Sequence, residues 1–203
     1  MGVIERLTEF FLKFPGIGLR QARRFVYFLL SIDSQQIDEF IALLQNLKIE
    51  IQQCILCYRF FEEMEKEGRM CPSCSKNFGS PILIVVEKDI DLENIQKGNT
   101  DSGVYFVLGG LLSPLTKESP ARIKELAERI KKDVLNKKLK EIIVALSAHP
   151  NGDYTTLHIK NILVPLVKKY ELKISTLGRG MSTGAELEYS DSETIKHALA
   201  NRK

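Results

Sequence analysis

The stretch Ile82-Leu83-Ile84-Val85-Val86-Glu87 is a run of five aliphatic residues that ends in a carboxylate. An uninterrupted apolar run of this length is typical of a strand that is buried on both faces of a parallel sheet. Similar runs follow at 104–108, 142–146 and 174–177. Helical patterns at about 120–138 and 155–170 separate several of these runs. Because strands alternate with helices, we expect an α/β domain with a mostly parallel sheet.

The residues that precede this region show the spacing of amphipathic helices. Apolar residues recur at every third or fourth position in three segments, and Pro15 and Gly16 interrupt the pattern after the first of them. Asp33 or Ser34 can cap the third helix. Its apolar stripe consists of Ile37, Phe40, Ile41, Leu44, Leu47 and Ile51. We expect this stripe to belong to the core rather than to a ligand-binding site, and we expect a short tail helix at about 192–201.

The composition is that of an ordinary globular chain. It has 203 residues, with 29 Lys and Arg against 26 Asp and Glu, so the formal charge is +3. This balance excludes a strongly basic nucleic-acid coat and an acidic disordered tail, but it allows a local basic patch. Neither a signal-peptide core nor an apolar run of about 20 residues occurs, so we expect a cytoplasmic protein without membrane contact.

Two C-x-x-C pairs contain all four cysteines, which are Cys54, Cys57, Cys71 and Cys74. In a reducing compartment such pairs are more often metal ligands than disulfides. Two pairs can complete the tetrahedral four-thiolate site that Zn²⁺ prefers, and a closed site of this kind is structural. The alternatives are two redox pairs or two structural disulfides. The module is too small for a core, so the metal would supply its folding energy.

A glycine turn lies between the first two expected helices, at Phe14-Pro15-Gly16-Ile17-Gly18. Gly16 and Gly18 permit backbone N–H groups to point together at an anion, and the next helix presents its N-terminus there. Arg20, Arg23 and Arg24 follow directly. This helix-hairpin-helix pattern is typical of proteins that bind DNA phosphates without reading bases. The alternative is a helical hairpin with a solvated basic face.

The carboxylate at the end of the first buried run indicates a resemblance to Toprim domains. That fold places a Glu at this position, here Glu87, and a D-x-D-x-x-G motif after a later strand, where the acids hold Mg²⁺. In this chain Ser147 and His149 occupy the two aspartate positions, although the spacing to Gly152 is kept. The sequence therefore predicts a Toprim-like domain with a poor magnesium site.

The order of these parts resembles the RecR family of bacterial recombination mediators over nearly the whole chain. The glycine turn, the paired C-x-x-C motifs and the stretch that ends at Glu87 carry the resemblance. Further matches are Tyr105-Phe106-Val107-Leu108-Gly109-Gly110-Leu111-Leu112-Ser113-Pro114 and the tail from Gly184 to Arg202. Two departures are the loop at 147–152, whose role becomes doubtful, and Arg20, which replaces the usual lysine and keeps the charge.

The resemblance implies an α+β chain of several domains. The expected parts are a helix-hairpin-helix region for DNA binding and oligomerisation at 1–53, a four-cysteine zinc finger at 54–79, a Toprim-like domain at 80–178 and a C-terminal tail for oligomer contacts at 179–203. Members of this family form rings, commonly tetramers built from dimers, that can encircle DNA. We therefore expect a homo-oligomer, from dimer to tetrameric ring.

The function that the resemblance implies is non-enzymatic. A ring-forming clamp would act with RecO, and possibly RecF, to load RecA on gapped DNA in repair, associated with the nucleoid. Arg20 and Arg24, with Arg23 alongside, map to the basic lining of the ring, and Glu87 and Asp91 map to the contact with RecO. Two other functions remain open, a small Mg²⁺-dependent Toprim nuclease and a zinc-stabilised protein-interaction module.

Overall fold

A computed structural model of the chain describes residues 1–62, 69–98, 103–115, 120–136 and 139–202. The chain divides into two compact units, Met1–Gln52 and Gln53–Lys203. Each unit is treated by itself below.

The first unit is helical, as the sequence predicts. It contains α1 (Val3–Phe11), α2 (Leu19–Ser31) and α3 (Ser34–Glu50). The ring centroids of Phe11 and Phe25 lie 5.5 Å apart in an edge-on arrangement, which joins α1 to α2. Asp33 caps α3, since its carboxylate accepts a 2.8 Å hydrogen bond from the backbone N–H of Gln36.

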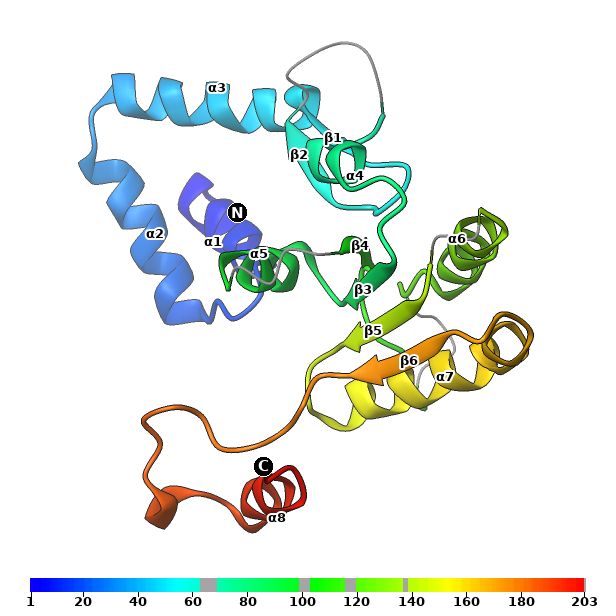
Figure 1. The fold of residues 1–203 in the computed structure, drawn as a ribbon. Coiled ribbons are helices and arrows are strands. Elements are labelled where there is room, and N and C mark those ends of the chain that lie inside the picture. The colour runs from blue at the N-terminus through cyan, green and yellow to red at the C-terminus, as the bar shows by residue number, and fades with distance from the viewer. Residues whose placement is uncertain (63–68, 99–102, 116–119, 137–138, 203) are drawn as a thin grey trace. The chain divides into compact units, whose positions relative to one another are not determined.

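The expectation that the apolar stripe of α3 forms a core is wrong for the chain taken alone. No residue of α3 is buried, and the side chains of Leu44 and Leu47 are 51% and 53% exposed. Among the described residues of this unit only Thr8, Ala22 and Val26 are buried. Within this unit α3 stands apart from α1 (Figure 1). Helical periodicity identifies which face is apolar but does not reveal what covers it.

The second unit is built on a parallel sheet, which confirms the predicted fold class. Its strands are β3 (Ile82–Val86), β4 (Val104–Val107), β5 (Glu141–Ala145) and β6 (Lys173–Thr176), in the order β4-β3-β5-β6. Every neighbouring pair is parallel. Val86 is in register with Val107 on one side and with Ala145 on the other, so the strands end at one common edge.

Helices cover the two faces of this sheet unequally. On one face lie α6 (Ile123–Leu135) and α7 (Pro150–Tyr170), whose Leu126, Ile130, Ile159 and Leu163 pack against Phe106 and other strand residues. On the other face lies α5 (Asp89–Lys97), which contributes Leu92 to a smaller cluster. Figure 1 shows α5 on the side of the sheet opposite to α7. The apolar runs of the sequence are therefore buried on both sides, as expected.

Two helices differ from the sequence expectation. α7 begins at Pro150 rather than near 155, because His149 caps it by accepting a hydrogen bond from the N–H of Gly152, and proline is well suited to a first helical turn. The stretch 147–153 is therefore a loop of a few residues followed by helix. α5 was not predicted, since its apolar residues are few. The expected helix at 120–138 extends past α6 into 137–138, which lie outside the described residues.

The remaining elements are short. The cysteine module contains β1 (Ile51–Gln53) and β2 (Phe60–Glu62), which pair with each other, and α4 (Pro72–Lys76). The tail holds a 3-10 turn, η1 (Leu187–Tyr189), and α8 (Ser192–Ala200), close to the predicted position. Over the residues that the structure describes, none of the helices combines the length and apolar character needed to cross a bilayer.

Candidate metal centre and nucleic-acid interface

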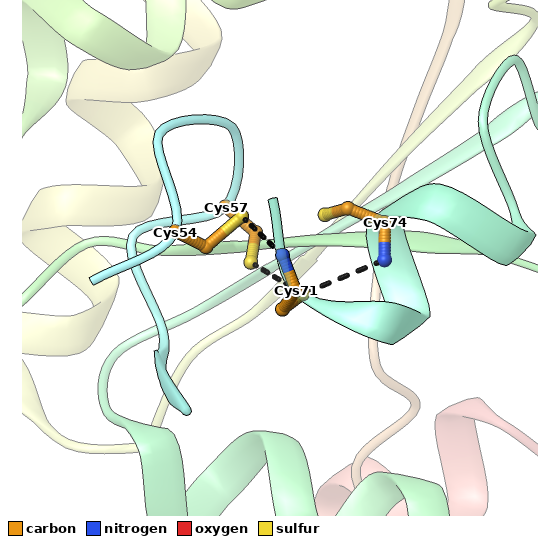
Figure 2. Close-up of side chains that lie close together, drawn as sticks. All are labelled: Cys54, Cys57, Cys71 and Cys74. Carbon is orange, nitrogen blue, oxygen red and sulfur yellow. Dashed lines mark hydrogen bonds between the residues drawn. The ribbon is translucent and has the colours of Figure 1, made fainter. Parts of the chain in front are cut away.

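The four cysteines come together in one buried cluster (Figure 2). One sulfur from each residue lies within 4.8 Å of the other three, and the sulfurs of Cys57 and Cys71 are 3.6 Å apart. All four thiols are free of disulfides. The structure therefore brings together the complete ligand set that the sequence predicts, and four thiolates suit a tetrahedral metal ion.

Each C-x-x-C pair is shaped by its own turn. In the first pair the N–H of Tyr58 donates to the carbonyl of Cys54 at 2.9 Å, and Tyr58 adopts a left-handed backbone conformation with φ 60°. In the second pair Cys71 caps α4, and its sulfur accepts from the N–H of Cys74 at 3.5 Å. The N–H of Cys71 donates to the sulfur of Cys54 at 3.4 Å, which ties the two pairs together.

Because the four sulfurs are close together, the pKa values of their thiols differ from one another. Hydrogen bonds from Cys57, Cys71 and Cys74 lower the pKa of the Cys54 thiol, whereas hydrogen bonds with Cys54, Cys57 and Cys71 raise the pKa of Cys74. Four thiolates cannot share this small volume without a counter-charge, and a divalent cation supplies one. With four protein ligands the ion has no open position for a substrate, so the site can support folding but not catalysis.

The glycine turn is formed as predicted. Gly16 has φ +77°, which is the left-handed region that glycine enters without strain, and Gly18 caps the N-terminus of α2. The N–H of Ile17 donates to the carbonyl of Phe14 at 3.2 Å. Residues 14–18 thus turn the chain tightly from α1 into α2, and the free N–H groups of the first turn of α2 face the same end.

The three arginines that follow the turn are exposed on α2. Arg20 and Arg24 are one helical turn apart and lie on the same face, and Arg23 is beside them. None of the three forms an ion pair with any residue that the structure describes. Their charges are therefore available to an external anion.

Glu87 and Asp91 lie close together at the carboxyl edge of β3, but both already have partners. Glu87 is 9% exposed, and its carboxylate is 2.9 Å from the ammonium of Lys88, whose pKa it raises. The carboxylate of Asp91 accepts a 2.9 Å hydrogen bond from the N–H of Lys88 and so caps α5. Asp89, which the sequence did not single out, accepts a 2.8 Å hydrogen bond from the N–H of Phe60.

The magnesium position of a Toprim domain is incomplete here. Ser147 and His149 follow β5, and His149 is used to cap α7. Across the described ranges, the four cysteines are the only group of three or more Cys, His, Asp or Glu side chains close enough to share an ion. Within that part of the chain Glu87 therefore does not belong to a group of three ligands that could hold an ion.

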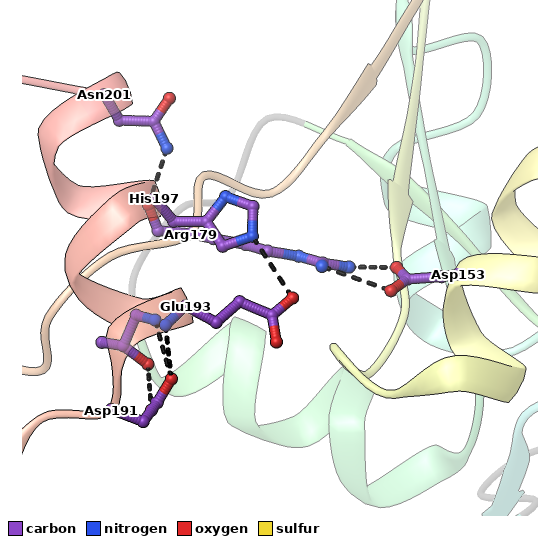
Figure 3. A network of polar contacts seen from close by, with 7 residues as sticks. Asp153, Arg179, Asp191, Glu193, His197 and Asn201 are labelled. Carbon is purple, nitrogen blue, oxygen red and sulfur yellow. Dashed lines mark hydrogen bonds and ion pairs between the residues drawn. The ribbon is translucent and has the colours of Figure 1, made fainter.

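One polar network could not have been found from the sequence. Asp153 at the start of α7 forms a two-pronged ion pair with Arg179, which lies beyond β6 (Figure 3). The carbonyl of Arg179 in turn accepts a 2.6 Å hydrogen bond from the Asn201 amide, so α8 is held near α7. A cavity of about 410 Å³ opens beside this network. No periodicity connects residues this far apart, and only the fold brings them together.

Comparison with known proteins assigns the second unit. The Toprim domain family matches residues 82–178, and the family described as "RecR, C-terminal" matches residues 180–203. The chain is therefore a Toprim-domain protein with a helical hairpin and a four-cysteine cluster suited to a metal ion.

Whole-chain relatives narrow this class. The chain is 34% identical to "Recombination protein RecR" of Endomicrobium trichonymphae, over 98% of this chain and 96% of the relative. It is 32% identical to the protein of the same name from Lactobacillus acidophilus, with the same coverage. It is 31% identical to that from Bifidobacterium longum subsp. infantis, over 100% of this chain and 96% of the relative. The chain belongs to the RecR family, which confirms the resemblance inferred from its motifs.

Proposed function

We propose that this protein is a non-enzymatic recombination mediator in DNA repair, and that it acts as a ring-forming clamp on DNA in the cytoplasm, at the nucleoid. The observation that carries the proposal is the whole-chain similarity to proteins named recombination protein RecR. The exposed arginines beside the glycine turn, which form no ion pair among the described residues, support the DNA contact.

The DNA contact is assigned to Gly16, Gly18, Arg20, Arg23 and Arg24. Backbone N–H groups at the turn and guanidinium groups on α2 suit phosphate oxygens, which carry no base sequence. Binding should therefore be independent of sequence. It should also weaken as salt rises, because each phosphate contact releases counterions.

The decisive experiment reverses charge on the face of α2. The double variant Arg20→Glu, Arg24→Glu should lose DNA binding while its mass in solution stays that of the wild type. A matched control is Lys168→Glu, Lys169→Glu, which makes the same change of charge on exposed residues at the end of α7. If the α2 variant binds gapped DNA as tightly as the control, the proposed DNA-binding face is wrong.

Oligomer formation is supported by apolar surface that the chain leaves uncovered. In the first unit Phe28, Leu30 and Leu43 are 61%, 66% and 63% exposed, and in the tail Tyr189 is 81% exposed. Large apolar side chains left exposed in this number favour contacts with other molecules. We assign these surfaces to contacts between copies in a dimer or a tetrameric ring. A mass in solution equal to one chain would contradict this.

The partner contact and the metal complete the proposal. We assign Glu87 and Asp91 at the N-terminal end of α5 to the contact with RecO, and possibly RecF, during RecA loading. We assign the ion of the cysteine cluster as structural Zn²⁺, because a four-thiolate site is characteristic of zinc. The nuclease is not favoured, because Ser147 and His149 occupy the two aspartate positions and the cysteines are the only group of three or more candidate ligands among the described residues. No observation of its own favours a bare interaction module.

A further inference from the structure

The cysteine cluster is fastened to the Toprim sheet through backbone groups of its first C-x-x-C turn. Leu56 lies between Cys54 and Cys57, and its carbonyl accepts a 2.8 Å hydrogen bond from the guanidinium of Arg129 on α6. Arg129 is only 8% exposed, and its Nε also donates to Asp133 at 2.6 Å. A buried arginine is costly unless its donors are satisfied. Asp133 satisfies one donor within α6, and the bond to Leu56 holds the turn against α6.

A metal ligand also bonds directly to the sheet. The carbonyl of Cys57 accepts a 2.8 Å hydrogen bond from the N–H of Val107, the last residue of β4. β4 is an edge strand, and Val107 is in register with Val86 on β3. The next N–H groups continue the ladder, since Leu108 donates to Val86 and Gly109 donates to Glu87, each at 2.9 Å. The turn that carries Cys57 therefore covers the open side of the edge strand β4, which pairs with β3, the strand that leads into Glu87.

The ring of Tyr58 fills the space between these bonds. It meets Phe106 edge-on with centroids 5.3 Å apart, and the guanidinium carbon of Arg122 lies 5.2 Å from its centroid. Arg122 also donates to the carbonyl of Val107 at 3.2 Å. Tyr58 is held in its left-handed conformation between the cysteine pair and the sheet.

The chain that leaves the turn then reaches α5. The N–H of Phe60 donates to the carboxylate of Asp89, the first residue of that helix. Asp89 lies between Glu87 and Asp91 in the sequence. Residues 56–60 thus contact the segment 86–91 directly at the start of α5, through Phe60 and Asp89. They also contact it indirectly, because Cys57 bonds to Val107 on β4 and β4 pairs with β3.

From these contacts we propose that the metal-bound turn is a positioning element for the acidic edge formed by Glu87 and Asp91, with Arg129 and Asp89 as the residues that transmit its order. Loss of the ion frees Cys54 and Cys57. The groups bonded to Val107, Asp89 and Arg129, which are Cys57, Phe60 and Leu56, then move away together. The segment 86–91 becomes less ordered as a result. The functional consequence rests on the proposed partner contact, because it predicts that metal loss weakens binding of RecO.

Hydrogen exchange on the full-length protein tests the structural part without any partner. Stripping the metal with a chelator should speed exchange at the amides of Phe60 and Val107 and also across 86–91. The amides of Ile142 and Val144 on β5 should keep their protection. If Phe60 and Val107 exchange faster but 86–91 does not change, the ion orders only its own module and the proposal is wrong.

Two sets of variants test the transmitting residues. Arg129→Met keeps the apolar stem but removes the bond to Leu56, and it should release metal to a chelator about tenfold faster. Lys132→Met on the exposed side of α6 should not. Asp89→Ala should speed hydrogen exchange across 86–91. Asp89→Asn keeps an acceptor for the N–H of Phe60, so this variant should exchange at the wild-type rate. Metal release from Arg129→Met at the wild-type rate overturns the role of Arg129.

Binding of RecO then separates this proposal from the proposed function. If zinc-loaded wild-type protein binds RecO and the stripped protein binds at least tenfold more weakly, both stand. Equal binding with and without metal overturns the positioning role alone. If the zinc-loaded protein does not bind RecO, the proposed function fails, and the exchange results still decide whether the ion orders the edge.

Discussion

Gly152 in the first turn of α7 lies directly against the backbone carbonyl of Ser147, so that a Cβ at this position would overlap the oxygen. Packing alone therefore requires a glycine here, although Ser147 and His149 occupy the positions where a magnesium-binding motif would place aspartates. Gly152→Ala should lower the free energy of unfolding by about 2 kcal/mol, because the backbone cannot move aside without shifting β5 or α7. Thermal unfolding measures this as a fall of roughly 4–8 °C.

The matched control for this variant is Gly178→Ala. A Cβ on Gly178 meets nothing within 4 Å, so the midpoint should stay within about 1–2 °C of the wild type. Equal midpoints for the two variants would show that the close approach of Gly152 to Ser147 does not limit stability.

Cys71→Ser should remove the metal. Cys71 provides one of four sulfurs, caps α4 and donates its N–H to the sulfur of Cys54. Elemental analysis should find about one ion per chain in the wild type and far less in the variant. Ser75→Ala, a change at an exposed residue of the same helix, should keep the ion. Wild-type protein without zinc or another metal would contradict the assignment of the cluster.

The sequence predicts the second unit well, because its strongest patterns are local. The strand Ile82–Val86 is visible as a continuous aliphatic run, and C-x-x-C spacing brings two sulfurs together whatever the surroundings are. The first unit is harder to predict. The stripe of α3 has a clear helical period, yet Leu44 and Leu47 are exposed, since a period shows which face is apolar and not what covers it.

The sequence could not show how the parts of the site are joined. Arg129 is one of many basic residues on a predicted helix, and its bond to the carbonyl of Leu56 spans 73 positions. The pairing of Asp153 with Arg179 spans 26. Charge patterns predict neither contact, because both depend on the sheet order β4-β3-β5-β6, which folds distant segments together.

Glu141 should give the pairing of β5 with β6 a dependence on pH. Its carboxylate accepts a 2.6 Å hydrogen bond from Ser175 and lies 3.1 Å from the ammonium of Lys173, and both lower its pKa. Because the folded-state pKa lies below the unfolded one, the stabilisation is complete at neutral pH. It is lost as the pH falls through the folded-state pKa.

Glu141→Gln should therefore be less stable than the wild type at pH 7, by less than about 1 kcal/mol for a pair this near the surface. The difference in the free energy of unfolding between the two proteins should become smaller only below the ordinary glutamate pKa of about 4.3. Unfolding of the two proteins compared at a series of pH values measures it. A difference that disappears between pH 7 and pH 6 would point to another group.

The protein should not cleave DNA with Mg²⁺ or Mn²⁺, because Glu87 is paired with Lys88 and Ser147 and His149 replace the two aspartates. Incubation of gapped and supercoiled DNA with either ion, followed by electrophoresis, tests this directly. Since trace nucleases contaminate many preparations, Glu87→Gln serves as the control. Cleavage that survives in Glu87→Gln belongs to a contaminant. Cleavage that needs the metal ion and disappears in Glu87→Gln would make the chain a Toprim nuclease and overturn the non-enzymatic assignment.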